Sequence, residues 1–175
     1  MTQFILHSLV GIQKYFYSAS TTVQRTFFKT LELGKVINKN DIAEALNSSI
    51  NSLYIENQSS KMSYIYTKPL YYGGVEWTMC QFDTVENEFS SILFTHVGDY
   101  NNQEIFKRLS SALTQKYGTP KHYNHEESWF DGTTAIILSY NYSRSKSGVM
   151  KHYVYLKYSD IDLFTKSSQI IQSEL

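Results

Sequence analysis

The strongest constraint on the fold is a series of alternating segments joined by tight turns between residues 129 and 158. Residues 129–134 place Asp131-Gly132 between strand-forming residues, and Asp-Gly is the strongest short signal for a β-hairpin. The next strand presents one face made of Ile136, Leu138, Tyr140 and Tyr142. After the polar loop 143–148, a further strand presents Met150, His152, Val154, Leu156 and Tyr158. Since these connections are too short for crossovers, the strands form an antiparallel meander.

A capping motif predicts a helix over residues 39–50. Asn38 can accept hydrogen bonds from the first free backbone N–H groups, and Asp41 stands where a capping box needs an acceptor. Ile37 and Ile42 flank the start as a hydrophobic staple. The apolar residues that follow fall on one side of a helix, so this side is expected to pack on a core.

The same motif predicts two more helices. Asn101 is the expected cap of the second helix, Glu104 completes its capping box, and Gly118 ends it. Ser159 and Asp162 occupy the corresponding positions before an apolar stretch near the C-terminal end. We therefore expect a closing helix after residue 159.

Similar sequence features recur at a fixed spacing of 63 positions in the two halves of the chain. The predicted caps Asn38 and Asn101 stand 63 positions apart, and at this offset the strand over residues 88–96 falls on residues 151–159. We interpret the offset as a degenerate tandem repeat of a helix-plus-strands unit. The alternative is that a common capping motif occurs twice by chance.

Further segments of period two lie before and between the helices. Residues 75–79 alternate between apolar and polar, and residues 89–97 are expected to form a second strand after a polar turn. Residues 27–33 and 63–66 are expected to form short strands. Helices separated by runs of hairpin-linked strands define the α+β class, with an antiparallel meander sheet and helices packed on one face. A chain of 175 residues is long enough for one core, so residues 1–175 are expected to form a single domain.

The first twenty residues admit two interpretations. Residues 4–12 are apolar and small residues stand at 18–20, as in an export signal, but no Lys or Arg precedes them. Ile5, Leu9 and Ile12 fall at helical spacing, which favours a packed N-terminal helix over a weak export signal. No segment approaches the roughly 18 apolar residues of a membrane span, and the compartment, cytoplasm or cell envelope, is left open.

Part of the chain, about residues 31–158, resembles a known group of proteins. The resemblance rests on residues 31–34 (Leu-Glu-Leu-Gly), 72–77 (Tyr-Gly-Gly-Val-Glu-Trp) and 113–120 (Leu-Thr-Gln-Lys-Tyr-Gly-Thr-Pro), and on Trp129 with the meander. In these segments the chain resembles small uncharacterised bacterial envelope proteins with a fold like that of beta-lactamase inhibitory protein. The resemblance implies tandem helix-plus-sheet units, a sheet surface that binds protein as in the inhibitor, and no catalytic residues.

Charge narrows the range of functions. The chain has 16 basic and 16 acidic residues and a formal net charge of zero, so it lacks the basic footprint of a nucleic-acid binder. Charged residues make up only 18% of the chain, and 15 tyrosines supply part of the remaining polar surface. Such a surface repels other molecules weakly, which favours contact with another protein and with further copies of the chain as a homo-oligomer.

No motif predicts an enzyme. One cluster of metal-ligand type is present, formed by His122, His125, Glu126 and Glu127. His96 or His152 could add a third ligand, but the spacing fits no zinc signature, so a solvated polar loop is the preferred interpretation. The single Cys80 excludes a disulfide framework and is expected in the core, and Asp83 is explained as a turn residue. We therefore expect no catalytic residue, no metal and no cofactor.

The best candidate for a binding surface is the last strand. Opposite its apolar series stand Lys151, Tyr153, Tyr155 and Lys157. Tyrosine combines a large apolar ring with a polar tip and is favoured at protein interfaces. We predict a non-catalytic binding protein that contacts another protein through this tyrosine-rich face, unless a helix covers it. The alternative is a small-molecule or glycan-binding module that uses Trp77 or Trp129 as a stacking platform.

Overall fold

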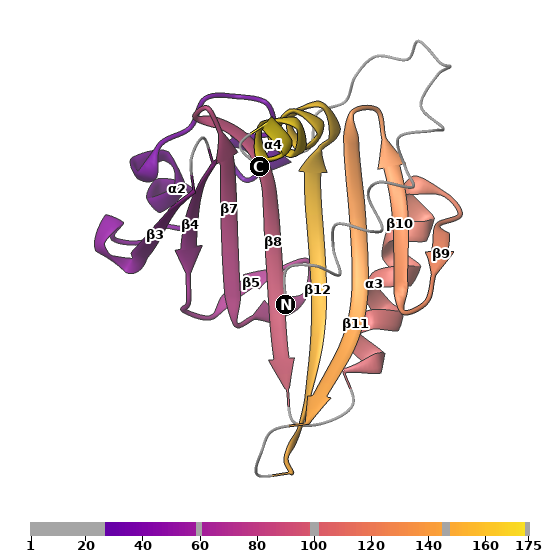
Figure 1. Cartoon of the computed structure of the whole chain (residues 1–175). Coiled ribbons are helices and arrows are strands. Elements are labelled where there is room, and N and C mark those ends of the chain that lie inside the picture. Colours follow the sequence, from indigo (N-terminus) through magenta and orange to yellow (C-terminus); the bar gives the residue numbers. More distant parts are fainter. Residues whose placement is uncertain (1–26, 59–60, 99–101, 145–147, 174–175) are drawn as a thin grey trace.

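The fold is built on one sheet of eight antiparallel strands (Figure 1). The computed structural model describes residues 27–58, 61–98, 102–144 and 148–173. In spatial order the sheet consists of β3 (Leu53–Gln58), β4 (Lys61–Tyr66), β7 (Met79–Val85), β8 (Glu88–Gly98), β12 (Met150–Asp160), β11 (Thr134–Arg144), β10 (Glu126–Asp131) and β9 (Lys121–Tyr123). This sheet, together with the helices, confirms the predicted α+β class.

Smaller elements surround the sheet. Two short hairpins, β1–β2 and β5–β6, lie beside it, and the helical segments are α2, α3, α4 and the 3₁₀ turn η2. Their bounds are β1 (Phe27–Phe28), β2 (Leu31–Glu32), β5 (Leu70–Tyr72), β6 (Val75–Trp77), α2 (Lys39–Ala45), η2 (Ile50–Ser52), α3 (Gln103–Tyr117) and α4 (Ile161–Ser173). The predicted helix or export signal over residues 1–20 lies outside the described residues.

Each half of the chain supplies a helix followed by four strands of the sheet. The first half gives α2 and then β3, β4, β7 and β8, and the second gives α3 and then β9 to β12. The last strands of the two halves, β8 and β12, pair in the middle of the sheet, with His152 opposite Gly98 and Ser159 opposite Ser91. Within the sheet, the two halves of the chain are therefore joined by a single strand pair.

One face of the sheet, here called the first face, carries the core. Alternation turns Phe82, Phe94, Leu156 and Ile136 toward this face, and each of the four is at most 2% exposed. Helices α2 and α3 and the two small hairpins cover it, and Phe28 from β1 packs on Phe82 and Phe94. The hydrophobic core thus lies between the sheet and these covering elements.

The opposite face, here called the second face, is more polar. It carries Ser63, Asp83, Ser91, Tyr153, Tyr155 and Lys157. Helix α4 contacts β8 and β12 and lies across one end of them, whereas α3 lies behind β10 and β11 in Figure 1. The Phe164 ring of α4 covers Lys157, with 5.7 Å from the Lys157 Nζ to the ring centroid. Only one end of the second face is therefore covered by a described helix.

The structure confirms the capping motif predicted for α2 and contradicts the one predicted for α3. At α2 the predicted capping box is present: Asn38 accepts from the N–H groups of Asn40 and Asp41, and the Asp41 carboxylate accepts from the Asn38 N–H. At α3 the prediction is wrong, because the N-cap position is Asn102, whose side chain donates to the His152 carbonyl instead of capping the helix.

The other helix ends were predicted in part. At α4 the predicted cap Ser159 is wrong, since Asp160 accepts from the Leu163 N–H. Gly118 ends α3 with φ of 84°, as predicted. The helix predicted to reach residue 50 ends at Ala45, and Asn47 just beyond it has φ of 51°.

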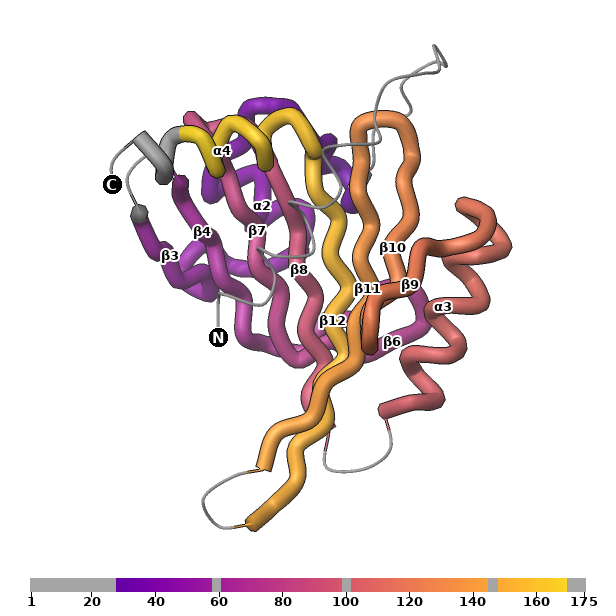
Figure 2. The backbone as a smooth tube through the Cα atoms, turned by 45° about the vertical axis from the view of Figure 1, so that its right-hand side comes forward, coloured from indigo at the N-terminus to yellow at the C-terminus, as the bar shows by residue number. Residues whose placement is uncertain are grey.

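The hairpin of β11 and β12 extends beyond its neighbours. The predicted turn is present, with Gly132 at φ of 60° between the paired residues Asp131 and Thr134. At the far end, the pairing with β10 stops at Ser139 and the pairing with β8 stops at His152. The remaining pairs of β11 and β12 form a two-stranded end that projects from the sheet (Figure 2).

Candidate functional site

The two predicted tyrosines lie side by side on the second face. The rings of Tyr153 and Tyr155 are stacked, with centroids 6.0 Å apart and planes 4° from parallel. Both side chains are partly buried, and the Ser143 hydroxyl donates to the Tyr153 hydroxyl at 3.3 Å. Burial, with a smaller effect of Tyr153, raises the pKa of Tyr155. The alternation of β12 thus produces a pre-organised aromatic pair beside the projecting end of the hairpin.

The two predicted lysines differ in their surroundings. Lys151 is partly buried near the projecting end. Lys157 lies under Phe164 of α4, and burial lowers the pKa of its ammonium group, an effect that Asp83 opposes. The expectation of two tyrosines flanked by accessible lysines is therefore corrected at Lys157, which belongs to a buried charge network.

Asp83 is the centre of this network and lies in β7, so its assignment to a turn is wrong. The residue is 4% exposed. Its carboxylate accepts from Ser63 Oγ at 2.7 Å, from Gln81 Nε2 at 2.8 Å and from Ser91 Oγ at 3.0 Å, and Lys61 Nζ lies 3.3 Å away. Burial alone would raise the pKa of this carboxyl, but the charges of Lys61 and Lys157 and these hydrogen bonds hold it below its ordinary value.

The two tryptophans belong to the core. Trp77 is 0% and Trp129 is 2% exposed, and each indole N–H donates to a backbone carbonyl, that of Tyr72 at 2.9 Å and that of Gly118 at 3.0 Å. Because neither ring presents a face to solvent, the stacking role predicted for Trp77 and Trp129 is wrong. Trp129 instead attaches β10 to the end of α3.

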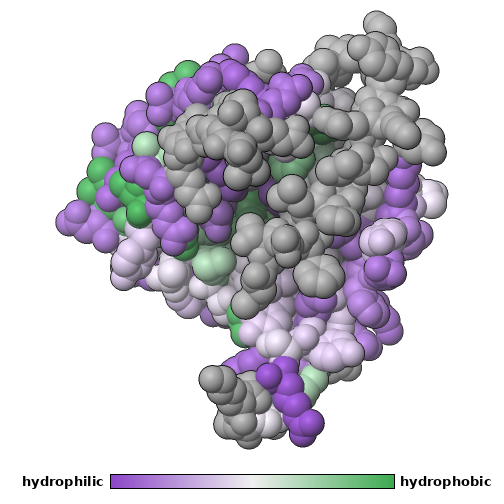
Figure 3. Space-filling view, viewed as in Figure 1, coloured by the Kyte–Doolittle hydropathy of each residue, from purple (hydrophilic) through white to green (hydrophobic). Residues whose placement is uncertain are grey.

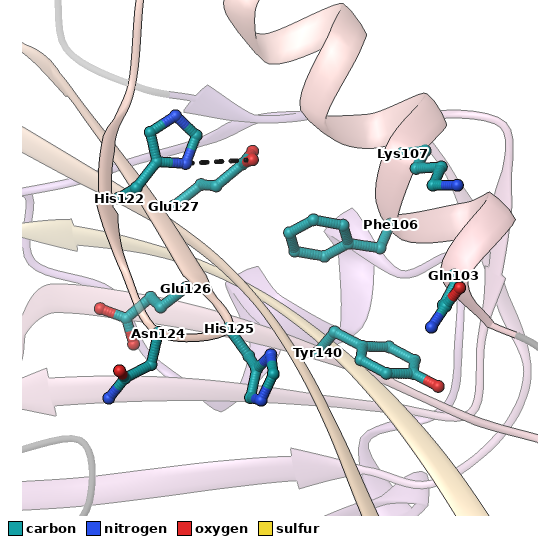
Figure 4. A pocket seen from close by; sticks show the side chains of 9 residues that line it. All are labelled: Gln103, Phe106, Lys107, His122, Asn124, His125, Glu126, Glu127 and Tyr140. Carbon is teal, nitrogen blue, oxygen red and sulfur yellow. Dashed lines mark ion pairs between the residues drawn. The ribbon is translucent and has the colours of Figure 1, made fainter.

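A cleft of about 310 Å³ opens between α3 and the β9–β10 hairpin. Its volume falls at the lower end of the range of ligand pockets, about 300–1,000 Å³. It is lined by Gln103, Phe106 and Lys107 of α3, by Tyr140 of β11, and by His122, Asn124, His125, Glu126 and Glu127 of the hairpin (Figure 4). Sequence patterns did not indicate the four residues from α3 and β11, because the docking of α3 and the pairing of β11 with β10 bring them to the hairpin.

Specific contacts hold the walls of the cleft. Phe106 and Tyr140 make an edge-to-face contact with centroids 6.4 Å apart, and the Tyr140 hydroxyl lies 2.6 Å from His152 Nδ1. On the hairpin, His122 Nδ1 lies 3.5 Å from Glu127 Oε1. The other carboxylate oxygen, Glu127 Oε2, is buried without a hydrogen-bond partner in the described part of the chain.

The metal-type cluster of the sequence does not converge. Within the described residues no three His, Cys, Asp or Glu side chains are grouped to hold a metal ion. The two additional ligands considered are engaged elsewhere, because His96 Nδ1 lies 2.7 Å from the Glu76 carbonyl and His152 bonds to Tyr140. Cys80 is 0% exposed, and burial raises the pKa of its thiol far above the ordinary range, only partly opposed by Lys29.

These features define an α+β protein whose eight-stranded antiparallel sheet carries its core on one face and a partly buried tyrosine pair on the other. The chain belongs to the TP0088 domain family, whose model matches residues 27–170. No curated protein matches the chain, and no solved structure matches it. Among the described helices, none has the length and apolar character needed to cross a membrane.

Proposed function

We propose that the protein is a non-catalytic binding protein that binds another protein through the second face around Tyr153 and Tyr155. The observation that carries this proposal is the stacked pair itself, two parallel rings 6.0 Å apart on a central strand. Stacking fixes both rings before a partner arrives, so little side-chain entropy is lost on binding. Rigid tyrosines of this kind are frequent anchors of protein interfaces.

The surroundings of the pair favour a partner with an acidic surface. Residues 140–153 contain Arg144, Lys146 and Lys151 and no Asp or Glu. Arg144 is exposed at the projecting end of the hairpin, and Tyr142 beside it is 61% exposed. In Figure 3 the lower end of the molecule carries strongly hydrophilic surface at its tip and paler, weakly polar surface above the tip. An acidic partner would complement this basic, aromatic end in charge.

The interaction can be tested by placing a photo-crosslinking amino acid at Tyr153 and, as a matched control, at Tyr71. Tyr71 is 74% exposed but lies on the small hairpin β5–β6, away from the pair. We expect an acidic protein to be captured at position 153 and not at position 71. Tyr153→Ala or Tyr155→Ala should then weaken its binding by about 1–3 kcal/mol, while Tyr71→Ala should not.

Two results would refute the proposal. One is capture of the same proteins at both positions, which indicates non-specific contact. The other is a large loss of thermal stability in both alanine variants, which would show that the tyrosines serve as core residues rather than as anchors.

The order of elements is consistent with two further interpretations, which we propose with the function. Each half of the chain contributes one helix and four strands, as a tandem repeat would. The same arrangement is in line with the resemblance to envelope proteins with a fold like that of beta-lactamase inhibitory protein. That resemblance, in turn, implies a protein-binding sheet face.

We also propose that copies of the chain associate through β3. This strand is at the edge of the sheet, pairs with β4, and exposes Tyr54 by 68% and Ile55 by 45%. An exposed edge strand with apolar side chains can pair with the same strand of a second copy. Light scattering at high micromolar concentration should give more than the monomer mass of 20.3 kDa, and Ile55→Lys should return it to the monomer. A wild-type protein that stays at monomer mass would contradict this proposal.

A further inference from the structure

The cleft beside α3 contains a buried acceptor that the described part of the protein leaves unused. Strand alternation turns Glu127 toward the first face, where it stands opposite His122 on β9 and Leu138 on β11. Its side chain is 13% exposed, and its Oε2 has no hydrogen-bond partner among the described residues. A buried carboxylate oxygen without a donor is costly, so a ligand that supplies an N–H or O–H donor there gains binding free energy.

Aromatic rings form the wall next to this acceptor. In Figure 4 the Phe106 ring points from α3 into the cleft, between the Glu127 carboxylate and Tyr140. The contact between Phe106 and Tyr140, and the hydrogen bond between the Tyr140 hydroxyl and His152 Nδ1, hold both rings in place. An aromatic face attracts cations as well as apolar groups, so this wall suits the charged end and the body of an organic cation.

Three basic side chains of the cleft are open to solvent. Lys107, His122 and His125 are all exposed, and in Figure 4 the Lys107 amine is on the far side of Phe106 from the Glu127 carboxylate. An anionic ligand that entered as deep as Phe106 would meet the unpaired oxygen of Glu127 and be repelled. A positively charged ligand with an N–H group would instead donate a hydrogen bond to that oxygen.

We propose that this cleft binds a small organic cation, in which an ammonium or guanidinium group donates to Glu127 Oε2 and an apolar or planar body packs on Phe106 and Tyr140. The volume of about 310 Å³ suits a ligand of metabolite size. The site lies on the first face, whereas Tyr153 and Tyr155 lie on the second face. The two proposals therefore succeed or fail separately.

The test compares three ligands that share one body and differ in charge. Tyramine is cationic, tyrosol is neutral and 4-hydroxyphenylacetate is anionic. Agmatine serves as a fourth probe, because it carries a guanidinium group. We expect tyramine or agmatine to bind in isothermal titration calorimetry at least tenfold more tightly than the neutral and anionic compounds. N-acetyl-arginine amide serves as a fifth probe, because binding of this compound alone would identify the cation as an arginine side chain of another protein.

Three variants locate the site. Glu127→Gln should weaken binding of the cation about tenfold or more, and Phe106→Ala should weaken it less. Glu104→Gln is the matched control, since it removes one negative charge from an exposed position on α3 that does not line the cleft, and it should bind as the wild type does. Glu127→Gln should keep the thermal midpoint of the wild type or raise it, because it removes a carboxylate oxygen that is buried without a hydrogen-bond partner in the described part of the chain.

Three outcomes would overturn the proposal. In the first, none of the cationic probes binds at millimolar concentration. In the second, the anionic analogue binds as tightly as tyramine does. In the third, Glu127→Gln and Glu104→Gln weaken binding equally, which would show that the cation is attracted only by the overall negative charge of the protein.

Discussion

Replacing Asp83 by Asn tests whether the charge network of the second face stabilises the fold. Asn has nearly the same size and keeps one oxygen for Ser63 and Gln81, but its amide group faces two donors, Ser91 Oγ and Lys61 Nζ. Lys157 also loses its counter-charge, so burial should lower the pKa of its ammonium group further.

The expected loss in the free energy of unfolding follows from how exposed the partners of Asp83 are. Removing one member of a buried ion pair costs about 3–5 kcal/mol. The Lys61 side chain is 35% exposed and can turn toward water, which places Asp83→Asn at the lower end, about 3 kcal/mol. Ser91→Ala is the matched control, because it removes a single hydrogen bond to the same carboxylate and should cost about 1 kcal/mol.

The effect of Asp83→Asn should depend on pH. Since the pKa of the Asp83 carboxyl in the folded protein lies below that of an unfolded aspartate, about 3.9, the stabilisation is fully present above that value. It is lost as the pH falls through the folded pKa. Urea unfolding should therefore give the largest difference between wild type and variant at pH 7 and a smaller one in acid. If Asp83→Asn lowers the free energy of unfolding by less than about 1 kcal/mol at pH 7, or by an amount that does not change with pH, the charge network does not stabilise the fold as argued.

Three further predictions concern the turns, caps and core. Asn38→Ala should lower the free energy of unfolding by about 1 kcal/mol in urea titrations, because it removes the capping box of α2, and an unchanged midpoint would contradict this role. Gly132→Ala should cost about 1 kcal/mol in the same assay, since φ of 60° strains a residue with a Cβ; equal stability would show that the turn adjusts freely. Cys80 should react with iodoacetamide only after unfolding, because burial keeps its thiol protonated; rapid labelling of the native protein would contradict that.

The features that could be predicted from the sequence are local ones. The turn at Asp131-Gly132 depends on neighbouring residues alone, and the alternation of β11 and β12 then sets which residues share a face. The box formed by Asn38 and Asp41 spans only four residues. Each of these signals is complete within a short segment, so no knowledge of the rest of the fold was needed.

The features that were missed depend on distant parts of the chain. Asp83 has the composition of a turn residue, and only Lys61 on β4 and Lys157 on β12 make it suitable for a buried strand position. Trp77 and Trp129 could serve as core or as ligand platforms, and only the packing of the covering elements decides between the two. Glu127 becomes an unpaired buried acceptor because α3 docks over the hairpin, which no local pattern of residues 121–131 reveals.

The pairing of β8 with β12 has a consequence for the order in which the chain folds. The other neighbouring strands of the sheet follow one another along the chain, with only the β5–β6 hairpin inserted between β4 and β7, whereas residues 91–98 must find residues 152–159 across the whole second half of the chain. Such a pairing has a high contact order, and closing the intervening loop slows folding. During synthesis β8 leaves the ribosome well before β12, so its open edge, with Phe94 and Ile92 in the same strand, is available to other chains until the last strand arrives. We therefore expect refolding yields to fall steeply with protein concentration, and chains truncated before β12 to aggregate.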